Sequence, residues 1–320
     1  MTERRRQGFR LPPGLRWVLT AVLLVGLAWL LDIDKLVDEL SRFSIVAVGL
    51  ALLVSVGQVV VSAWRWRFTT RSLGLTLALR DAVREYYLAT FLNQCLPGGV
   101  LGDVNRAWRH GSGSGERGTS LHAVMIERLS GQLAMCAVAL SAGVWLAVTQ
   151  PPFRALGSQW GGGIGIGLLL IAVTITVVVI FGRRLWRRFR DYLATLGRDL
   201  YRGLLSPRVF PVQILSSLLV VATYLAVFWL LAASAHGDLS LEQTLTLLAL
   251  CSLLLLAMVI PLTVAGWGVR EGAAAVLWPL AGLPAEQGVA LSVGYGLTVL
   301  LSSLPGSLFT FSRPAAGPAD

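Results

Sequence analysis

The chain contains 320 residues, of which 55% are hydrophobic and only 14% are charged. Soluble globular domains carry about 25% charged residues, so this composition excludes a soluble globular protein. The apolar residues fall into several separate runs, and these lack the alternation of apolar and polar positions that is typical of a transmembrane β-barrel. We therefore predict an all-α polytopic membrane protein, because a helix satisfies its own backbone hydrogen bonds within a lipid core.

The charge is strongly basic, with 27 lysine and arginine residues against 17 acidic ones and a formal net charge of +10. The arginines lie between the apolar runs, where they determine membrane topology, so we expect no nucleic-acid partner. The three cysteines are far apart within apolar segments, and the three histidines are scattered. No disulfide framework, metal site or cofactor is therefore indicated.

Six apolar runs are long enough to cross a bilayer core of about 30 Å. They lie at 15–31, 44–63, 121–148, 161–182, 210–235 and 286–311. Two other apolar segments, at 82–101 and 242–283, are interrupted by proline and glycine. We predict that both form re-entrant helical hairpins, which enter the membrane, break and turn back.

The order of these elements is the same in both parts of the chain: two spans, one broken segment and one span. Broken segments at corresponding places of two halves are typical of an internal structural repeat whose binding site lies at the breaks. The sequence thus predicts a single membrane domain over 1–320. It would consist of repeat halves 15–150 and 160–312 with inverted topology.

Membrane orientation follows from the arginines, because short cytoplasmic loops collect basic residues. This rule predicts a cytoplasmic amino terminus in the cytoplasmic (inner) membrane. If 242–283 is a hairpin, the carboxy terminus is cytoplasmic too, whereas a complete span at 242–261 would leave it outside; we favour the hairpin. The segment 183–208 carries apolar residues at helical spacing among arginines, which predicts an amphipathic connector on the cytoplasmic leaflet or, alternatively, a topology anchor without a binding role.

The first break is the strongest local signal for a binding site. Its glycines allow the backbone to turn and expose amide groups, and the helix that restarts near Asp103 directs its positive end toward the break. Arg106 adds a planar fork of donors that matches a phosphate group. The alternative is a cytoplasmic helix end with a glycine turn. The candidate residues of this break are Gly98, Gly99, Gly102, Asp103 and Arg106.

The second break repeats the order of proline, glycine and arginine, which weakens that alternative. Its candidate residues are Pro261, Gly266, Gly268, Arg270 and Glu271. One such break is common in membrane proteins, whereas two at corresponding positions favour a shared binding site.

A third candidate is Glu127 with Arg128, which lies within a predicted span. Charges within a span are costly unless they are paired or face a watery cavity, so they are functional candidates. Arg128 lies near a predicted cytoplasmic end, so the alternative is that it extends to the lipid headgroups. Asp103 and Glu127 are candidates either to neutralise an arginine or to take up a proton during transport, and the residues alone leave both roles open.

Three groups of residues resemble a known family. They are Pro97-Gly98-Gly99-Val100 with Gly102-Asp103 and Arg106, Glu127-Arg128 with Gly131, and Gly266-Trp267-Gly268-Val269-Arg270-Glu271. Together they resemble the lysylphosphatidylglycerol synthase transmembrane region, also called the flippase-like family, over nearly the whole chain. The chain departs from the family at Glu127, where aspartate is more usual. The resemblance implies lipid translocation, and because only 314–320 follow Arg313 we do not expect the soluble aminoacyl-transfer domain of the full-length synthases.

We therefore predict a flippase-like carrier for an anionic lipid, either a phospholipid or a polyprenyl-phosphate-linked lipid. One alternative is a membrane transferase that uses Asp103, Glu127 or Glu271 as a base, and another is a non-catalytic partner of a glycosyltransferase or lipid synthase. No nucleophile pair or P-loop is present, which favours a transporter over an enzyme. The predicted phosphate-binding residues are Arg106, Arg270, Gly98, Gly99, Gly102, Gly266 and Gly268, and the predicted proton or charge partners are Asp103, Glu127, Arg128 and Glu271.

Overall fold

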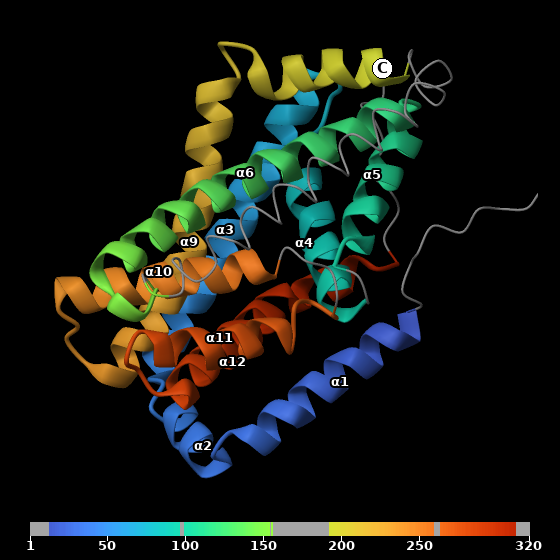
Figure 1. Cartoon of the computed structure of the whole chain (residues 1–320). Coiled ribbons are helices and arrows are strands. Elements are labelled where there is room, and N and C mark those ends of the chain that lie inside the picture. The colour runs from blue at the N-terminus through green and yellow to red at the C-terminus, as the bar shows by residue number, and fades with distance from the viewer. Residues whose placement is uncertain (1–12, 97–98, 154, 156–191, 259–262, 312–320) are drawn as a thin grey trace, which may run out of the picture.

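The structure is a computed structural model that describes residues 13–96, 99–153, 155, 192–258 and 263–311. All regular secondary structure among these residues is helical, which confirms the predicted all-α fold (Figure 1). The helices are α1 (Pro13–Leu30), α2 (Ile33–Ser41), α3 (Ile45–Ser72), α4 (Leu79–Cys95), α5 (Leu101–Ser114), α6 (Arg117–Thr149), η1 (Tyr201–Leu205), α9 (Phe210–His236), α10 (Leu241–Ala257), α11 (Val269–Leu280), α12 (Ala285–Ser303) and η2 (Leu304–Phe309). A helical segment at 192–200 precedes η1.

Four of the described helices are long and apolar enough to cross a membrane: α3, α6, α9, and α12 continued by η2. They coincide with four of the six predicted spans. The first predicted span, 15–31, corresponds to α1, and the predicted span 161–182 lies outside the described residues. The helix α10 is apolar but shorter, with 17 residues. The chain is therefore a polytopic α-helical membrane protein.

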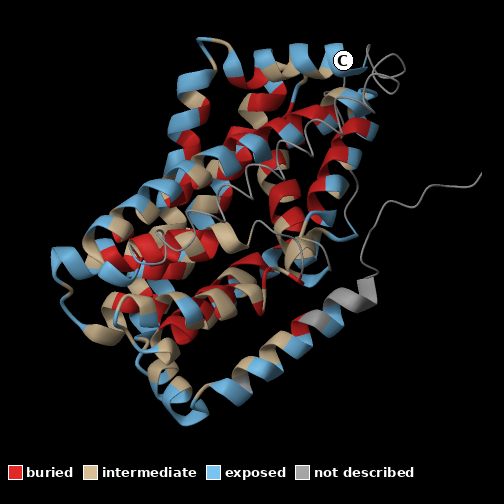
Figure 2. Ribbon diagram, in the orientation of Figure 1, coloured by how far each residue is buried: buried red, intermediate tan, exposed pale blue. Residues whose placement is uncertain are grey.

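The core of the bundle is formed where α3, α6, α9, α10 and α12 pack against one another. Small residues on the buried face of α3, such as Ala51, Ser55 and Ala63, allow neighbouring helices to approach closely, as is usual between helices in a membrane. Phe228 of α9 stacks on Tyr295 of α12 with ring centroids 4.1 Å apart. Buried residues run along the inner faces of these helices, whereas α1 and α2 are largely exposed (Figure 2).

The first predicted break is present and joins α4 and α5 into a helical hairpin (Figure 1). A Cβ atom on Gly102 would lie 2.0 Å from the carbonyl oxygen of Ala89, so only glycine allows this close packing. The Asn93 side chain accepts a hydrogen bond from the Gly102 N–H at 2.8 Å and donates one to Asp103 at 3.0 Å. A side chain of α4 thus satisfies the first turn of α5, which has no capping side chain of its own.

The second predicted break is also present, between the end of α10 and the start of α11. Gly266 and Gly268 have φ angles of +79° and +85°, a conformation that favours glycine. Helix α1 covers this turn, because the Thr20 hydroxyl accepts a hydrogen bond from the Val264 N–H at 3.1 Å. A Cβ atom on Gly268 would lie 2.7 Å from Leu23, so α1 and the turn fit together only with glycine at this position. The depth of both breaks in the membrane and the inverted repeat stay predictions.

The described part of the predicted connector 183–208 is helical from 192 to Leu205 and lies across one end of the bundle (Figure 1). His122 of α6 holds it there, with hydrogen bonds of 2.7 Å to Asp199 and 3.3 Å to the hydroxyl of Tyr192. The predicted residues 183–191 lie outside the described part of the chain. The contact of this segment with a membrane leaflet stays a prediction.

Candidate functional site

The two breaks line one cavity with a volume of about 730 Å³. Gly99 and Val100 line it from the first break, and Thr263, Ala265 and Gly266 line it from the second. The two breaks, which are far apart in sequence, therefore line a common cavity, and the predicted binding site at this place stays a prediction.

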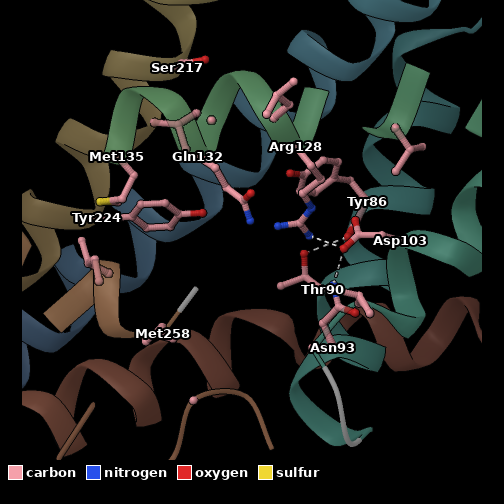
Figure 3. A pocket seen from close by; sticks show the side chains of 18 of the residues that line it. Tyr86, Thr90, Asn93, Asp103, Arg128, Gln132, Met135, Ser217, Tyr224 and Met258 are labelled. Carbon is pink, nitrogen blue, oxygen red and sulfur yellow. Dashed lines mark hydrogen bonds and ion pairs between the residues drawn. The ribbon is translucent and has the colours of Figure 1, made fainter. Parts of the chain in front are cut away.

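The cavity wall is polar on one part and apolar on another. Figure 3 shows Arg128 and Gln132 of α6 pointing into the same space as Thr90 and Asn93 of α4. The apolar residues of the wall include Leu121, Met125, Leu129, Leu196, Leu200, Val220, Val221, Leu255, Met258 and Val299. A wall of this kind suits an amphiphile, with a polar headgroup near Arg128 and an apolar chain along the remainder.

Arg128 has the most exposed side chain of the described arginines that line the cavity. Its side chain is 43% exposed, and its Nη2 lies 2.6 Å from Oδ2 of Asp103. Asp103 is nearly buried, at 9% exposure, so it fixes the direction of the guanidinium from behind. Of the two readings of the sequence, the geometry favours a residue that faces the cavity over one that extends to the headgroups.

Arg106 is fully buried and, like Arg128, pairs with Asp103. Its Nη2 lies 2.6 Å from Oε2 of Glu127, and its Nε donates to Asp103 at 2.9 Å. The guanidinium also lies over the rings of Trp66 and Tyr86, at 4.8 and 4.6 Å from their centroids. Ion pairs and cation–π contacts together offset the cost of burying this charge. Arg106 is not among the residues that line the cavity, so in this conformation it supports Asp103 and Glu127.

Arg65 of α3 is a member of the charged cluster that the sequence interpretation missed. It is 4% exposed, it pairs with Glu127, and its Nη1 donates to Ser217 of α9 at 3.0 Å. From the sequence it is one of the arginines between the apolar runs, for which a role in membrane topology is expected. The available signal was its helical spacing from Ser62 and Thr69, which are buried polar residues on the same face of α3.

Gly131 of α6 makes room for this arginine. A Cβ atom at this position would lie 3.0 Å from Nη2 of Arg65, which Glu127 and Ser217 already hold in place. This glycine belongs to the motif on which the family resemblance rests. Because it lacks a side chain, it leaves space beside α6 for the buried guanidinium of Arg65.

Arg270 at the second break has surroundings similar to those of Arg106. Its Nη2 lies 2.7 Å from Oε1 of Glu271, and its guanidinium lies 5.1 Å from the ring of Trp267 and 5.3 Å from that of Tyr295. Glu271 also accepts a hydrogen bond from the Gly268 N–H at 2.7 Å, which closes the turn. Each break is therefore followed by one arginine that contacts a tryptophan, a tyrosine and a carboxylate. Unlike Arg106, Arg270 lines the cavity.

The predicted glycines have different physical roles. Gly99 and Gly266 line the cavity, with φ angles of +62° and +79°. Gly102 and Gly268 allow close helix packing and do not line it. Gly98 lies outside the described residues. Phosphate binding by these glycines stays a prediction.

No group of three histidine, cysteine, aspartate or glutamate side chains suited to a metal ion occurs in the described part of the chain. The charged residues of the cavity are instead arginines that are paired with carboxylates. The chemistry of these residues suits an anionic group, because a guanidinium fork matches the geometry of a phosphate.

These features define a polytopic helical membrane protein with an amphiphilic, arginine-bearing cavity between two helix breaks. The chain belongs to the lysylphosphatidylglycerol synthase TM region family, whose profile matches residues 17–306. The match covers nearly the whole chain and confirms the resemblance seen in its motifs. Comparison with curated proteins gives no match. Membership of this family supports a membrane protein linked to lipid metabolism or transport.

Proposed function

We propose that the protein moves an anionic lipid, either a phospholipid or a polyprenyl-phosphate-linked lipid, from one side of the bilayer to the other. The observation that supports this function best is the single cavity on which both breaks and Arg128 converge. Its wall has a charged part for a phosphate and an apolar part for a hydrocarbon chain. In this proposal the phosphate meets Arg128 first, and Arg270 approaches it from the second break.

Arg106 acts in this proposal mainly through Asp103 and Glu127, which hold Arg128 and Arg65 in place. Its Nη1 is buried and has no hydrogen-bond partner among the described residues. Arg106 therefore keeps one donor that would reach a phosphate if the first break rearranged during transport. This proposal differs from the prediction from the sequence, in which Arg106 and Arg270 both contact the phosphate.

The transferase alternative has weaker support. Asp103 and Glu127 each pair with two arginines, and Glu271 pairs with Arg270 and accepts the Gly268 N–H. A general base needs a carboxylate that is available to a substrate proton. All three candidate bases are occupied by arginines, which favours lipid movement over headgroup transfer.

The experiment is transport by the purified full chain in lipid vesicles. Phosphatidylglycerol labelled on its acyl chain is added to the membrane, and a reductant outside the vesicles bleaches only the outer leaflet, so the loss of the protected fraction reports transbilayer movement. Arg128→Gln should slow this movement about tenfold or more, because it removes a charge at the headgroup. The control is Arg42→Gln, which removes an exposed arginine that pairs with Asp38 outside the cavity. Equal rates for wild type and Arg128→Gln would contradict the proposal.

A further inference from the structure

The described charged groups around the cavity do not balance, and together they carry one excess positive charge. The described charged residues that line the cavity or pair directly with a lining residue are Arg65, Arg106, Arg128, Arg270, Asp103, Glu127 and Glu271. Four arginines against three carboxylates leave a single excess positive charge. This excess charge is most accessible at Arg128, since Arg128 has the most exposed side chain of the seven residues. One negative charge on a ligand would neutralise the site.

The rest of the polar wall is uncharged. The neutral hydrogen-bonding side chains among the described residues that line the cavity are Gln58, Tyr86, Thr90, Asn93, Gln94, Gln132, Ser217, Tyr224, Thr263 and Tyr295. Every carboxylate of the described cluster already has an arginine partner, so an ammonium group on a ligand would find no free counter-ion. A second phosphate would find no second excess arginine. Both kinds of charged headgroup would therefore be bound at a cost.

Thr263 points to what the headgroup carries. Its side chain is 2% exposed, it lines the cavity, and its hydroxyl has no hydrogen-bond partner among the described residues. A buried hydroxyl without a partner is destabilising, and a ligand hydroxyl that reaches it would relieve this cost. This observation is independent of the charge balance and lies at the second break, on another part of the wall from Arg128.

We propose that the cavity selects a lipid with one negative charge, as in a phosphodiester, and an uncharged headgroup that carries hydroxyl groups. This inference rests on the proposed function and narrows its substrate class. It disfavours lipids with an amine on the headgroup and lipids with a second phosphate. The selection arises from the residual charge of the cluster rather than from the shape of one pocket.

The charge balance is tested at Gln132, which lies one helical turn after Arg128 and points into the same space (Figure 3). Vesicle transport is measured for acyl-labelled phosphatidylglycerol, phosphatidylethanolamine and phosphatidylglycerophosphate. The wild type should prefer phosphatidylglycerol about tenfold or more over the other two. Gln132→Arg should raise the rate for phosphatidylglycerophosphate relative to phosphatidylglycerol about tenfold, and Gln132→Glu should abolish the preference over phosphatidylethanolamine.

The matched control is Gln150, at the carboxyl end of the same helix and outside this cavity. Gln150→Arg and Gln150→Glu should leave the wild-type order of lipids unchanged. If all three lipids move equally fast in the wild type, or if the Gln132 variants keep the wild-type ratios, the charge inference is wrong although lipid movement stands. If the wild type moves none of the lipids, the proposed function itself is wrong.

The headgroup is tested with Thr263→Val, a change of similar shape that removes the hydroxyl. The probe pair is phosphatidylglycerol and phosphatidylmethanol, which carry the same charge but differ in headgroup hydroxyls. Thr263→Val should slow phosphatidylglycerol several-fold and leave phosphatidylmethanol unchanged. It should not lower the melting temperature, because it removes a buried group that has no partner in the free protein. Equal slowing of both lipids, or no slowing of either, would overturn the assignment of Thr263.

Discussion

Arg128 and Asp103 form an ion pair of 2.6 Å in which the carboxylate is nearly buried and the arginine is open to the cavity. The second oxygen of the same carboxylate accepts from Arg106, which is fully buried and bound to Glu127. Asp103 thus links the buried ion pairs of Arg106 and Glu127 to Arg128, which a ligand in the cavity can contact. Substitutions of Arg106 and of Arg128 therefore distinguish which of the two arginines binds the phosphate.

We expect Arg106→Ala and Arg128→Ala to fail in different ways. Loss of Arg106 breaks a buried ion pair and removes the contacts with the rings of Trp66 and Tyr86, which should cost about 3 to 5 kcal/mol of folding free energy. Loss of Arg128 should change the free energy of unfolding much less and should slow lipid movement. Thermal unfolding in detergent, measured beside vesicle transport, checks both. If Arg106→Ala is as stable as wild type and inactive, Arg106 is the direct ligand.

Gly102→Ala should destabilise the α4–α5 hairpin. The added methyl group would overlap the carbonyl oxygen of Ala89, and backbone atoms have to move, which we expect to cost about 1 to 3 kcal/mol. Gly143→Ala in α6 is the control, because a Cβ atom there meets nothing within 4 Å. That change should be neutral or stabilising, since alanine is the better helix former. Equal melting temperatures for the two variants would contradict the close packing.

His122→Ala should loosen the helical segment that lies across one end of the bundle. His122 provides hydrogen bonds to Asp199 and Tyr192, and Leu196 of the same segment lines the cavity. In a background without native cysteines, Leu196→Cys should react faster with a maleimide when His122 is replaced. His236→Ala, at a histidine outside this cavity, should leave the rate unchanged. An unchanged rate in His122→Ala would show that other contacts hold the segment.

Thr20→Val should destabilise the second break from a distance. The change removes the acceptor for the Val264 N–H, a buried donor, and should cost about 1 to 3 kcal/mol. Thr223→Val is a suitable control, because the Thr223 hydroxyl donates only to the carbonyl of Val220 in its own helix. The melting temperatures of the two variants provide the comparison. A smaller effect for Thr20→Val than for Thr223→Val would contradict a capping role for α1.

The helical fold and both breaks could be predicted from the sequence, because apolar runs of fixed length and interrupting glycines are local signals. The contact of α1 with the second break could not, since the only trace it leaves is a threonine in an apolar run. The glycines of the breaks were predicted from the sequence to bind a phosphate, which stays a prediction, and their roles in packing were not foreseen. Gly102 and Gly268 serve helix packing, which depends on neighbours that are distant in sequence.

The candidate site was predicted in part. The charged residues of the breaks and the pair Glu127 and Arg128 were identified, because charges in apolar surroundings are conspicuous. The sequence did not show which of these charged residues are buried and which face the cavity, since sequence spacing does not show which arginine a carboxylate binds. Arg65 was missed for a related reason: near the end of an apolar run, an arginine that folds inward has the same local pattern as one that determines topology.

The contact between Thr20 and Val264 joins two positions that are 244 residues apart in the chain. At about 5 to 20 residues per second, the ribosome makes the second of them roughly 10 to 50 seconds after the first. Helix α1 therefore leaves the ribosome well before the segment that it contacts at the second break. During that interval the face of α1 that later contacts the second break is covered by something else, either lipid or a protein that assists membrane insertion. A fusion partner at the amino terminus would act on the same late step, so its effect should appear in the yield of correctly assembled protein rather than in the rate of synthesis.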